Sequence, residues 1–373
     1  MKIVADDKIP FLKGVFEPYG EIVYLPGDEI NTDLLKDADV LLTRSITQCN
    51  ADLLKKTAVK FIVTATIGDD HIDKLYCMDH NIEWATAKGS NAGAVEQYVT
   101  SALIEKAANE KLDLVGKTIG IIGVGEIGSR IKRVAELLGM NVLLNDPPRA
   151  RAEGQEGFVN LEEIQQKADY ITIHVPLTFG GADKTFHLLN ESFFEGLNRP
   201  VVLINTSRGA VLDTEVLKYA YREGFIKKLV IDVWENEPEI DEELMNMAGI
   251  STPHIAGYSV EGKANATAMV VHAVSDFYGL GKDDWFPNIP ADPRQMELNC
   301  QGLSNLEIFR MVFNAVYPIH ADSVTLKTAP DHFKDLRRNY VYRHENSGWE
   351  LILHNAGEEV KLKLKSFGFH IGV

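Results

Sequence analysis

The stretch that decides the fold is Lys117 to Asp146, KTIGIIGVGEIGSRIKRVAELLGMNVLLND. Residues 118–122 are a short, β-branched apolar run, which predicts a buried strand of a parallel sheet. Residues 126–138 carry apolar side chains at helical spacing, and residues 141–145 predict a second strand that ends at Asp146. These segments predict one strand–helix–strand unit of an α/β fold.

Three glycines follow the first strand as G-x-G-x-x-G: Gly123, Gly125 and Gly128. This is the fingerprint of dinucleotide binding, since the glycines permit a tight turn, the approach of a pyrophosphate and close helix packing. Asp146 stands 18 positions after Gly128, where a carboxylate accepts hydrogen bonds from ribose hydroxyls and repels a 2′-phosphate. We therefore predict NAD as the cofactor. Arg149, three residues further on, leaves NADP as the alternative.

Composition and charge restrict the class of protein. The chain has 373 residues, of which 45% are hydrophobic and 25% charged, which is ordinary for a globular protein of two or three domains. We see no apolar run that spans a bilayer and no signal-peptide pattern at MKIVADDKIPF. Three scattered cysteines predict neither a disulfide framework nor a metal site. A cytoplasmic enzyme is the expected class.

The net charge of −16, from 38 basic and 54 acidic residues, argues against nucleic acid or an anionic membrane as a partner. A small anionic substrate remains compatible with this charge, because surface charge is screened over about 8 Å at physiological salt. Such a substrate would need its own local arginines or lysines.

The strand and helix patterns predict three domains. Residues 1–90 alternate strands with helices, and a long helix near 259–279 is expected to return to them, so 1–95 with 258–284 form a substrate-binding domain. Residues 96–257, which begin with a long helix, form the NAD-binding domain. Residues 285–373 follow a proline-rich boundary and form an α+β domain. The expected elements of that domain are a helix near 303–315 and strands at 349–354 and 359–365.

The motifs with catalytic potential follow strands of the NAD-binding domain. Arg208 lies in the run NTSRG after the apolar run VVLI, where its planar fork suits a carboxylate, with a structural ion pair as the alternative. Glu237 ends the run DVWENE, and His254 lies in TPHIAGYS. A carboxylate beside a histidine holds one tautomer and stabilises the protonated ring. We expect Glu237 and His254 to form an acid–base pair.

The order of these motifs over residues 1–280 resembles the D-isomer-specific 2-hydroxyacid dehydrogenase family. The resemblance implies two doubly wound parallel-sheet domains, a Rossmann NAD domain and a flavodoxin-like substrate domain. It also implies that Arg208, Glu237 and His254 are catalytic. The implied cofactor contacts are Gly123, Gly125, Gly128, Asp146, Val175, Thr206, Ser207, Arg208, Asp232 and Gly257.

A closer resemblance is to a branch of that family that acts on a small phosphorylated 2-hydroxy acid. The runs TRSITQCN, DPPR and HIAGYS and the extra C-terminal region carry it. It implies substrate contacts from Ser45, Thr66 and Tyr258. We add Arg44 as a reader of the phosphate, because an acidic protein needs local donors for a dianion; a surface ion pair is the alternative.

This resemblance also implies that the C-terminal domain pairs two subunits into a homodimer. The apolar helix pattern there has few partners within the region, so we expect dimerisation to complete its core. Three other interpretations stay open. The chain could act on another substrate, such as 3-phosphoglycerate, or bind NAD as a sensor without catalysis. The C-terminal region could instead bind a regulatory effector.

Overall fold

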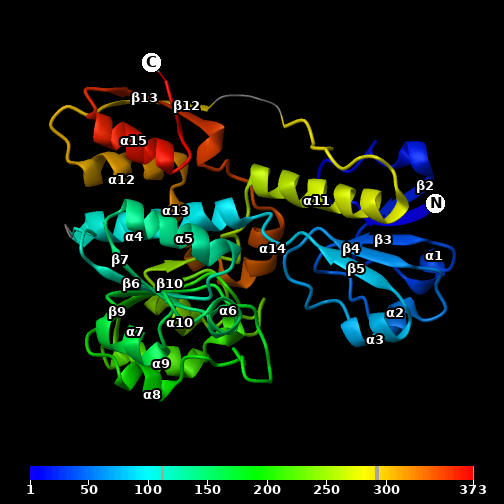
Figure 1. Ribbon diagram of the computed structural model, residues 1–373, viewed down its shortest axis with the longest axis horizontal. Helices are drawn as coiled ribbons and strands as arrows, with labels where there is room; N and C mark the ends of the chain where they lie inside the picture. Colours follow the sequence, from blue (N-terminus) through cyan, green and yellow to red (C-terminus); the bar gives the residue numbers. More distant parts are fainter. Residues whose placement is uncertain (111–112, 290–293, 373) are drawn as a thin grey trace. The chain divides into compact units, whose positions relative to one another are not determined.

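The computed structural model describes residues 1–110, 113–289 and 294–372. The chain forms two compact units (Figure 1). Unit 1 contains Met1–Asn91 and Ser259–Ala291, and unit 2 contains Ala92–Tyr258 and Asp292–Val373. Within the described ranges, no helix has both the length and the apolar character needed to cross a membrane.

Unit 1 is built on a five-stranded parallel sheet with the order β2-β1-β3-β4-β5. Its strands are β1 (Lys2–Asp6), β2 (Glu21–Leu25), β3 (Val40–Thr43), β4 (Phe61–Thr64) and β5 (Glu83–Thr86). One face packs against the valines of α11 (Val260–Tyr278). The other face is covered by α1 (Thr32–Leu35), α2 (Ala51–Leu54) and α3 (Lys74–Asp79). Figure 1 shows α11 on one side of this sheet and α2 and α3 on the other. Helices on both faces explain why β3 and β4 are fully buried apolar runs.

Unit 2 contains a six-stranded parallel sheet with the order β11-β10-β9-β8-β6-β7. Its strands are β6 (Thr118–Ile122), β7 (Asn141–Asn145), β8 (Tyr170–Ile173), β9 (Val201–Asn205), β10 (Ile226–Ile231) and β11 (Ile250–Ser251). The strand order reverses at β6, which pairs with β7 on one side and β8 on the other. Ligands of doubly wound sheets bind beyond the carboxyl ends of the strands at such a point. The fold class expected from the sequence is therefore confirmed.

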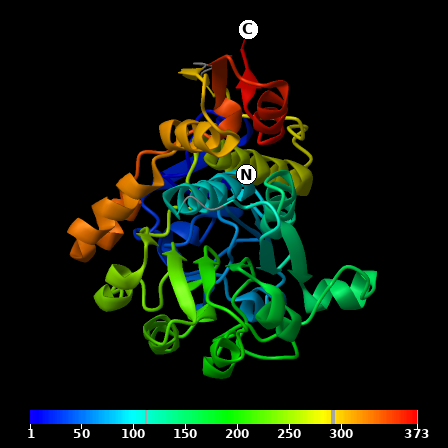
Figure 2. The ribbon, with the colours of Figure 1, turned by 90° about the vertical axis from the view of Figure 1, so that its left-hand side faces the viewer.

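Two layers of helices cover this sheet, as Figure 2 shows. On one face lie α4 (Ala92–Glu110) and α5 (Glu126–Leu137). The other face packs against α7 (Leu161–Lys167), α8 (Glu191–Glu195), α9 (Thr214–Arg222) and α10 (Glu242–Met247). The short helix α6 (Pro147–Glu153) follows β7.

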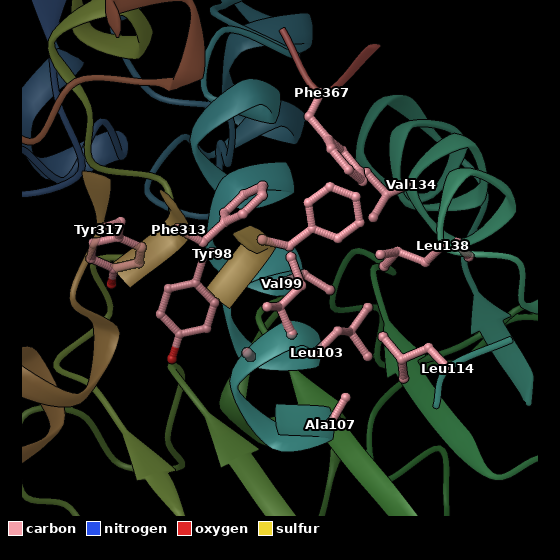
Figure 3. Close-up of a cluster of buried hydrophobic side chains, with 14 of the residues drawn as sticks. Tyr98, Val99, Leu103, Ala107, Leu114, Val134, Leu138, Phe313, Tyr317 and Phe367 are labelled. Carbon is pink, nitrogen blue, oxygen red and sulfur yellow. The ribbon is translucent and has the colours of Figure 1, made fainter. Parts of the chain in front are cut away.

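Helix α4 is the centre of the largest apolar core (Figure 3). It contacts α5 on one side and α12 (Asn305–Val316) on another. Tyr98 and Val99 of α4 are both fully buried, and Phe313 of α12 and Phe367 pack into the same cluster. The apolar face of α12, which we expected a second subunit to cover, packs against α4 of the same chain.

The C-terminal residues of unit 2 form a three-stranded parallel sheet of β12 (Arg294–Asn299), β13 (Trp349–His354) and β14 (His370–Ile371). The same part of the chain contains, besides α12, the helices α13 (Ile319–Thr328), α14 (Phe333–Arg338) and α15 (Glu358–Ser366). These residues and the nucleotide-binding sheet belong to the same compact unit. The expected division of unit 2 into two domains stays a proposal.

The strand expected at residues 359–365 is wrong, since this segment is the helix α15. Its apolar residues alternate in the sequence, but only Val360 and Leu364 are buried, while Leu362 is 62% exposed. Residues four apart share one face of a helix. Acidic residues in the first turn, lysines in the last turn and the Glu359–Lys363 ion pair at 3.1 Å also favour the helix.

Candidate nucleotide and acid–base site

The glycine loop between β6 and α5 has the shape that pyrophosphate binding requires. Gly123 has a φ of +88°, and a Cβ there would lie 2.7 Å from the backbone carbonyl of His174. A Cβ on Gly128 would lie 2.1 Å from the Gly123 oxygen, so only glycine lets α5 pack this closely. A Cβ on Gly125 would meet no atom within 4 Å. The first turn of α5 therefore opens onto free space, which suits a phosphate group.

Asp146 ties this loop to the end of β7. One carboxylate oxygen accepts the Val124 N–H at 2.8 Å, and the other accepts the Arg149 N–H at 3.1 Å and caps α6. Each carboxylate oxygen has a second lone pair, so both retain capacity for ribose hydroxyls. The Arg149 side chain forms two 2.7 Å hydrogen bonds with Glu153. Because its guanidinium is already paired, Arg149 is poorly placed to receive a 2′-phosphate.

The remaining proposed cofactor residues line the ends of β8 and β9. Val175 follows β8, and its Cγ1 would lie 2.8 Å from a Cβ on Gly123. The Thr206 hydroxyl lies 3.4 Å from Nδ1 of His174, and Ser207 donates its N–H and its hydroxyl to the Asn205 side chain. Burial of the His174 ring lowers its pKa to about 3, so this imidazole is neutral at physiological pH.

Asp232, at the end of β10, organises the loop that presents the histidine. Its fully buried carboxylate accepts the Thr252 hydroxyl at 2.6 Å and the N–H groups of Ile255 and Ala256 at 2.8 and 2.9 Å. Burial raises the pKa of Asp232 despite these donors. These contacts show that Asp232 holds the loop of residues 252–256 in place. Gly257 lies in the same loop, and the cofactor contacts of both residues remain a proposal.

Glu237 and His254 form a hydrogen-bonded pair, with His254 Nδ1 at 2.8 Å from Glu237 Oε2. The other oxygen, Oε1, accepts the Trp234 N–H at 2.9 Å, which fixes the carboxylate. The side chains are 26% and 19% exposed for His254 and Glu237. Burial alone would raise the pKa of Glu237, but the adjacent His254, the Trp234 N–H and the nearby Arg337 lower it. A charged Glu237 selects the tautomer in which His254 Nδ1 carries the proton and Nε2 has a lone pair.

Arg208 follows β9 in an extended backbone conformation. Its Nη1 donates to the Ser207 carbonyl at 2.8 Å, and the Asn205 amide donates to the Arg208 carbonyl at 3.1 Å. The side chain is partly exposed. The adjacent Gly209 leaves no room for a Cβ, which would lie 1.9 Å from the Trp234 backbone carbon. The backbones of the Arg208 and Glu237 segments are therefore locked together.

The substrate residues expected in unit 1 lie at the ends of neighbouring strands β3 and β4. Arg44 donates through Nε to the fully buried Asp6 at 3.0 Å, so the alternative of an ion pair is present in the structure. Ser45, the next residue, is exposed. The Thr66 hydroxyl lies 2.6 Å from that of Thr64 and donates to the Gly68 carbonyl at 2.8 Å.

Two arginines that the motif analysis did not identify approach the loop that carries His254 from the C-terminal region of unit 2. Arg337 donates from Nε to the Tyr258 hydroxyl at 3.3 Å, and its Nη1 lies 3.5 Å from Glu237 Oε2. The buried Arg343 donates to the carbonyls of Ile255, Ala256 and Tyr258. Neither residue stands in a recognisable motif. The basic run at residues 337–343 was the one sequence feature that could have indicated their role. Among the described residues, no cluster of His, Cys, Asp or Glu has the composition of a metal site.

Comparison with known proteins identifies the family. The family model for the NAD-binding domain of D-isomer-specific 2-hydroxyacid dehydrogenases matches residues 85–256. Over 356 residues the chain is 44% identical to an erythronate-4-phosphate dehydrogenase of Bacteroides thetaiotaomicron, covering 94% of this chain and 99% of the relative. A Bacteroides fragilis protein of the same name is 41% identical over 354 residues, 95% and 99% of the two chains. The crystal structure of an Aquifex aeolicus D-lactate dehydrogenase with NAD and lactic acid aligns with a TM-score of 0.63 and 25% identity, covering 78% of this chain and 100% of that chain.

Proposed function

Because the chain belongs to the D-isomer-specific 2-hydroxyacid dehydrogenases, and within them to the erythronate-4-phosphate dehydrogenases, we propose that it oxidises 4-phospho-D-erythronate. The product is 3-hydroxy-2-oxo-4-phosphooxybutanoate, and the reaction serves pyridoxal 5′-phosphate (vitamin B6) biosynthesis. The observation that carries this proposal is the Glu237–His254 pair at 2.8 Å, in the same unit as the glycine loop.

The residues present fit NAD, since the open side of Gly125 and the first turn of α5 suit its pyrophosphate and Asp146 suits its ribose. When bound, NAD accepts the hydride that leaves C2 of the substrate. Val175, Thr206, Ser207, Asp232 and Gly257 are the further residues that we propose to hold it.

Proton transfer falls to His254. Its Nε2 lone pair takes the proton of the 2-hydroxyl group, and the imidazole becomes positively charged. Glu237 stabilises that charge through the Nδ1–H hydrogen bond and keeps the ring oriented. Arg208 binds the substrate carboxylate, because its fork forms two parallel hydrogen bonds with a carboxylate and helps to polarise the adjacent C2. These residues supply acid–base and electrostatic catalysis.

We propose that Ser45, Thr66 and Tyr258 bind the substrate and that Arg44 reads its phosphate. The Arg44–Asp6 bond uses Nε, and the guanidinium presents further N–H donors on its two Nη atoms. The proposal is thus compatible with the ion pair, which would hold Arg44 in one orientation.

We also propose a homodimer and a cytoplasmic location. The C-terminal residues expose large apolar side chains, with Val341 86%, Val324 59% and Met311 44% exposed. A contact between two copies would cover them. Cys49, Cys77 and Cys300 are free thiols, which suits a reducing compartment.

The decisive experiment measures NADH formation from a panel of 2-hydroxy acids with and without a terminal phosphate. We expect the highest kcat/KM with 4-phosphoerythronate. Faster turnover of 3-phosphoglycerate would assign the chain a different substrate. NAD binding without turnover of any member would indicate a sensor and overturn the proposal.

A further inference from the structure

A third charged residue, Arg337, lies beside the two residues of the Glu237–His254 pair. It comes from a distant part of the sequence. Its Nη1 lies 3.5 Å from Glu237 Oε2, the oxygen that contacts His254. The guanidinium is therefore about 6 Å or less from the imidazole, a range at which charges shift one another's titration. Arg337 is 31% exposed, so solvent screens this effect only in part.

Helix α14 holds Arg337 in this place. Phe333, at the start of the helix, is 2% exposed and belongs to the core beneath the nucleotide-binding sheet, and Leu336 packs against that core. Arg337 also donates from Nε to the Tyr258 hydroxyl at 3.3 Å. The next residue, Arg338, is exposed. The chain thus fixes one of two consecutive arginines against the catalytic pair and leaves the other in solvent.

We propose that Arg337 is a positioning residue that tunes the acid–base pair, an inference that rests on the proposed function. Its charge competes with the protonated imidazole for Glu237, so it favours the neutral His254 that must take the substrate proton. Its bond to Tyr258 also aligns that side chain with Glu237. The C-terminal region thereby acts on the chemistry as well as on assembly.

The other groups that face the pair have fixed roles. Asp232, at the end of β10, is buried, interacts with the His254 charge and is committed to the loop N–H groups. Tyr258 belongs to the histidine loop, and its hydroxyl faces Arg337. Because Glu237 is also held by the Trp234 N–H, removing Arg337 should change the charge near the pair more than its geometry.

The test is the pH profile of kcat/KM for hydroxy-acid oxidation. In Arg337→Gln the protonated imidazole loses a repelling charge, so the acidic limb should move to higher pH by about half to one pH unit. Activity on that limb should fall by roughly three- to tenfold, while the plateau at high pH changes less. Arg337→Lys keeps the charge and should restore most of the profile, and Arg338→Gln is the matched control that should leave it unchanged.

Each outcome separates this inference from the proposed function. An active Arg337→Gln variant with an unmoved acidic limb would overturn the tuning role. A raised KM for phosphorylated substrate with an unmoved limb would make Arg337 a substrate contact instead. If Arg337→Gln does not fold, Arg337→Met takes its place, because methionine fills similar space without a charge. An unmoved acidic limb in that variant would equally overturn the tuning role. A wild-type chain that oxidises none of the panel would refute the proposed function itself.

Discussion

His254, the proposed acid–base residue, has a charge partner in Glu237, and the surroundings of Glu237 control its ionisation. Glu237 has a lowered pKa, because His254, the Trp234 N–H and Arg337 outweigh its burial, and it therefore stays ionised across the neutral range. Glu237→Gln keeps the shape but removes the charge. The protonated imidazole is then less favoured, so the acidic limb of kcat/KM should move to lower pH, opposite to the shift expected for Arg337→Gln.

The maximal rate of Glu237→Gln should fall by roughly a hundredfold or more, since the developing imidazolium loses its partner. The measurement is the pH profile of NADH formation. Glu239→Gln, an exposed residue two positions on, is the control and should behave like wild type. An unmoved limb in Glu237→Gln would give Glu237 another role.

We propose that Asp146 determines the choice of cofactor. Its charge lies beside the glycine loop, and Arg149 is paired with Glu153. A 2′-phosphate would meet the carboxylate without a free arginine to offset it, so we expect NAD to be preferred over NADP by at least about tenfold in kcat/KM. Asp146→Asn, combined with Glu153→Gln to release Arg149, should narrow this ratio. Equal kcat/KM for the two cofactors in the wild type would contradict the assignment.

Arg44 forms an ion pair with Asp6, so an experiment must distinguish this structural role from the proposed role in phosphate binding. Arg44→Ala should lower kcat/KM for 4-phosphoerythronate about ten- to a hundredfold and scarcely alter activity on erythronate, since one charge-assisted hydrogen bond to phosphate is lost. Asp6→Asn breaks the same ion pair but keeps Arg44, so it controls for the structural effect. Equal losses on both substrates would mean that Arg44 supports the fold.

At the scale of elements, the segment after α14 holds the loop of residues 255–258 in place through Arg343. This buried side chain donates to three carbonyls of residues 255–258, to the Ala94 carbonyl and to the Gln97 side chain. Arg343→Met should leave several of these acceptors unpaired and reduce the free energy of unfolding by about 3 kcal/mol or more. Urea denaturation measures this loss. Arg338→Met, on the exposed position, should change stability little.

The elements that sequence analysis predicted best are buried parallel strands. β6 and β7 begin and end at the expected residues, because an apolar run between turn residues has few other stable arrangements. α15 was missed because alternate apolar residues in a short, charged segment satisfy strand and helix patterns alike. The Glu237–His254 contact was predicted from the two motifs that carry these residues, because a carboxylate beside a histidine holds one tautomer. The Arg337 contact was not, since it joins residues 100 positions apart in sequence and depends on how α14 packs.

At the scale of the whole molecule, the packing of α12 on α4 changes how the dimer must be tested. Deleting residues 286–373 would uncover Tyr98 and Val99, which lie in the core, and would remove Arg343. We expect the truncated chain to aggregate, because α4 would expose a large apolar face. Aggregation of that variant would show that the core is disrupted, and it would not test whether the intact chain forms a dimer. That question requires substitutions in the full-length protein.

A substitution on the surface isolates assembly from folding. Val341 is 86% exposed and Val324 59%, so a glutamate at either position costs little in an isolated chain but would bury an unpaired charge in a contact between two copies. In the full-length protein, Val341→Glu with Val324→Glu should convert a dimer to a monomer in sedimentation or light scattering while circular dichroism stays unchanged. Leu75→Glu, 75% exposed on α3 of unit 1, is the control and should leave the dimer intact. If the double variant remains a dimer, the contact lies elsewhere, and a wild-type monomer would refute the homodimer altogether.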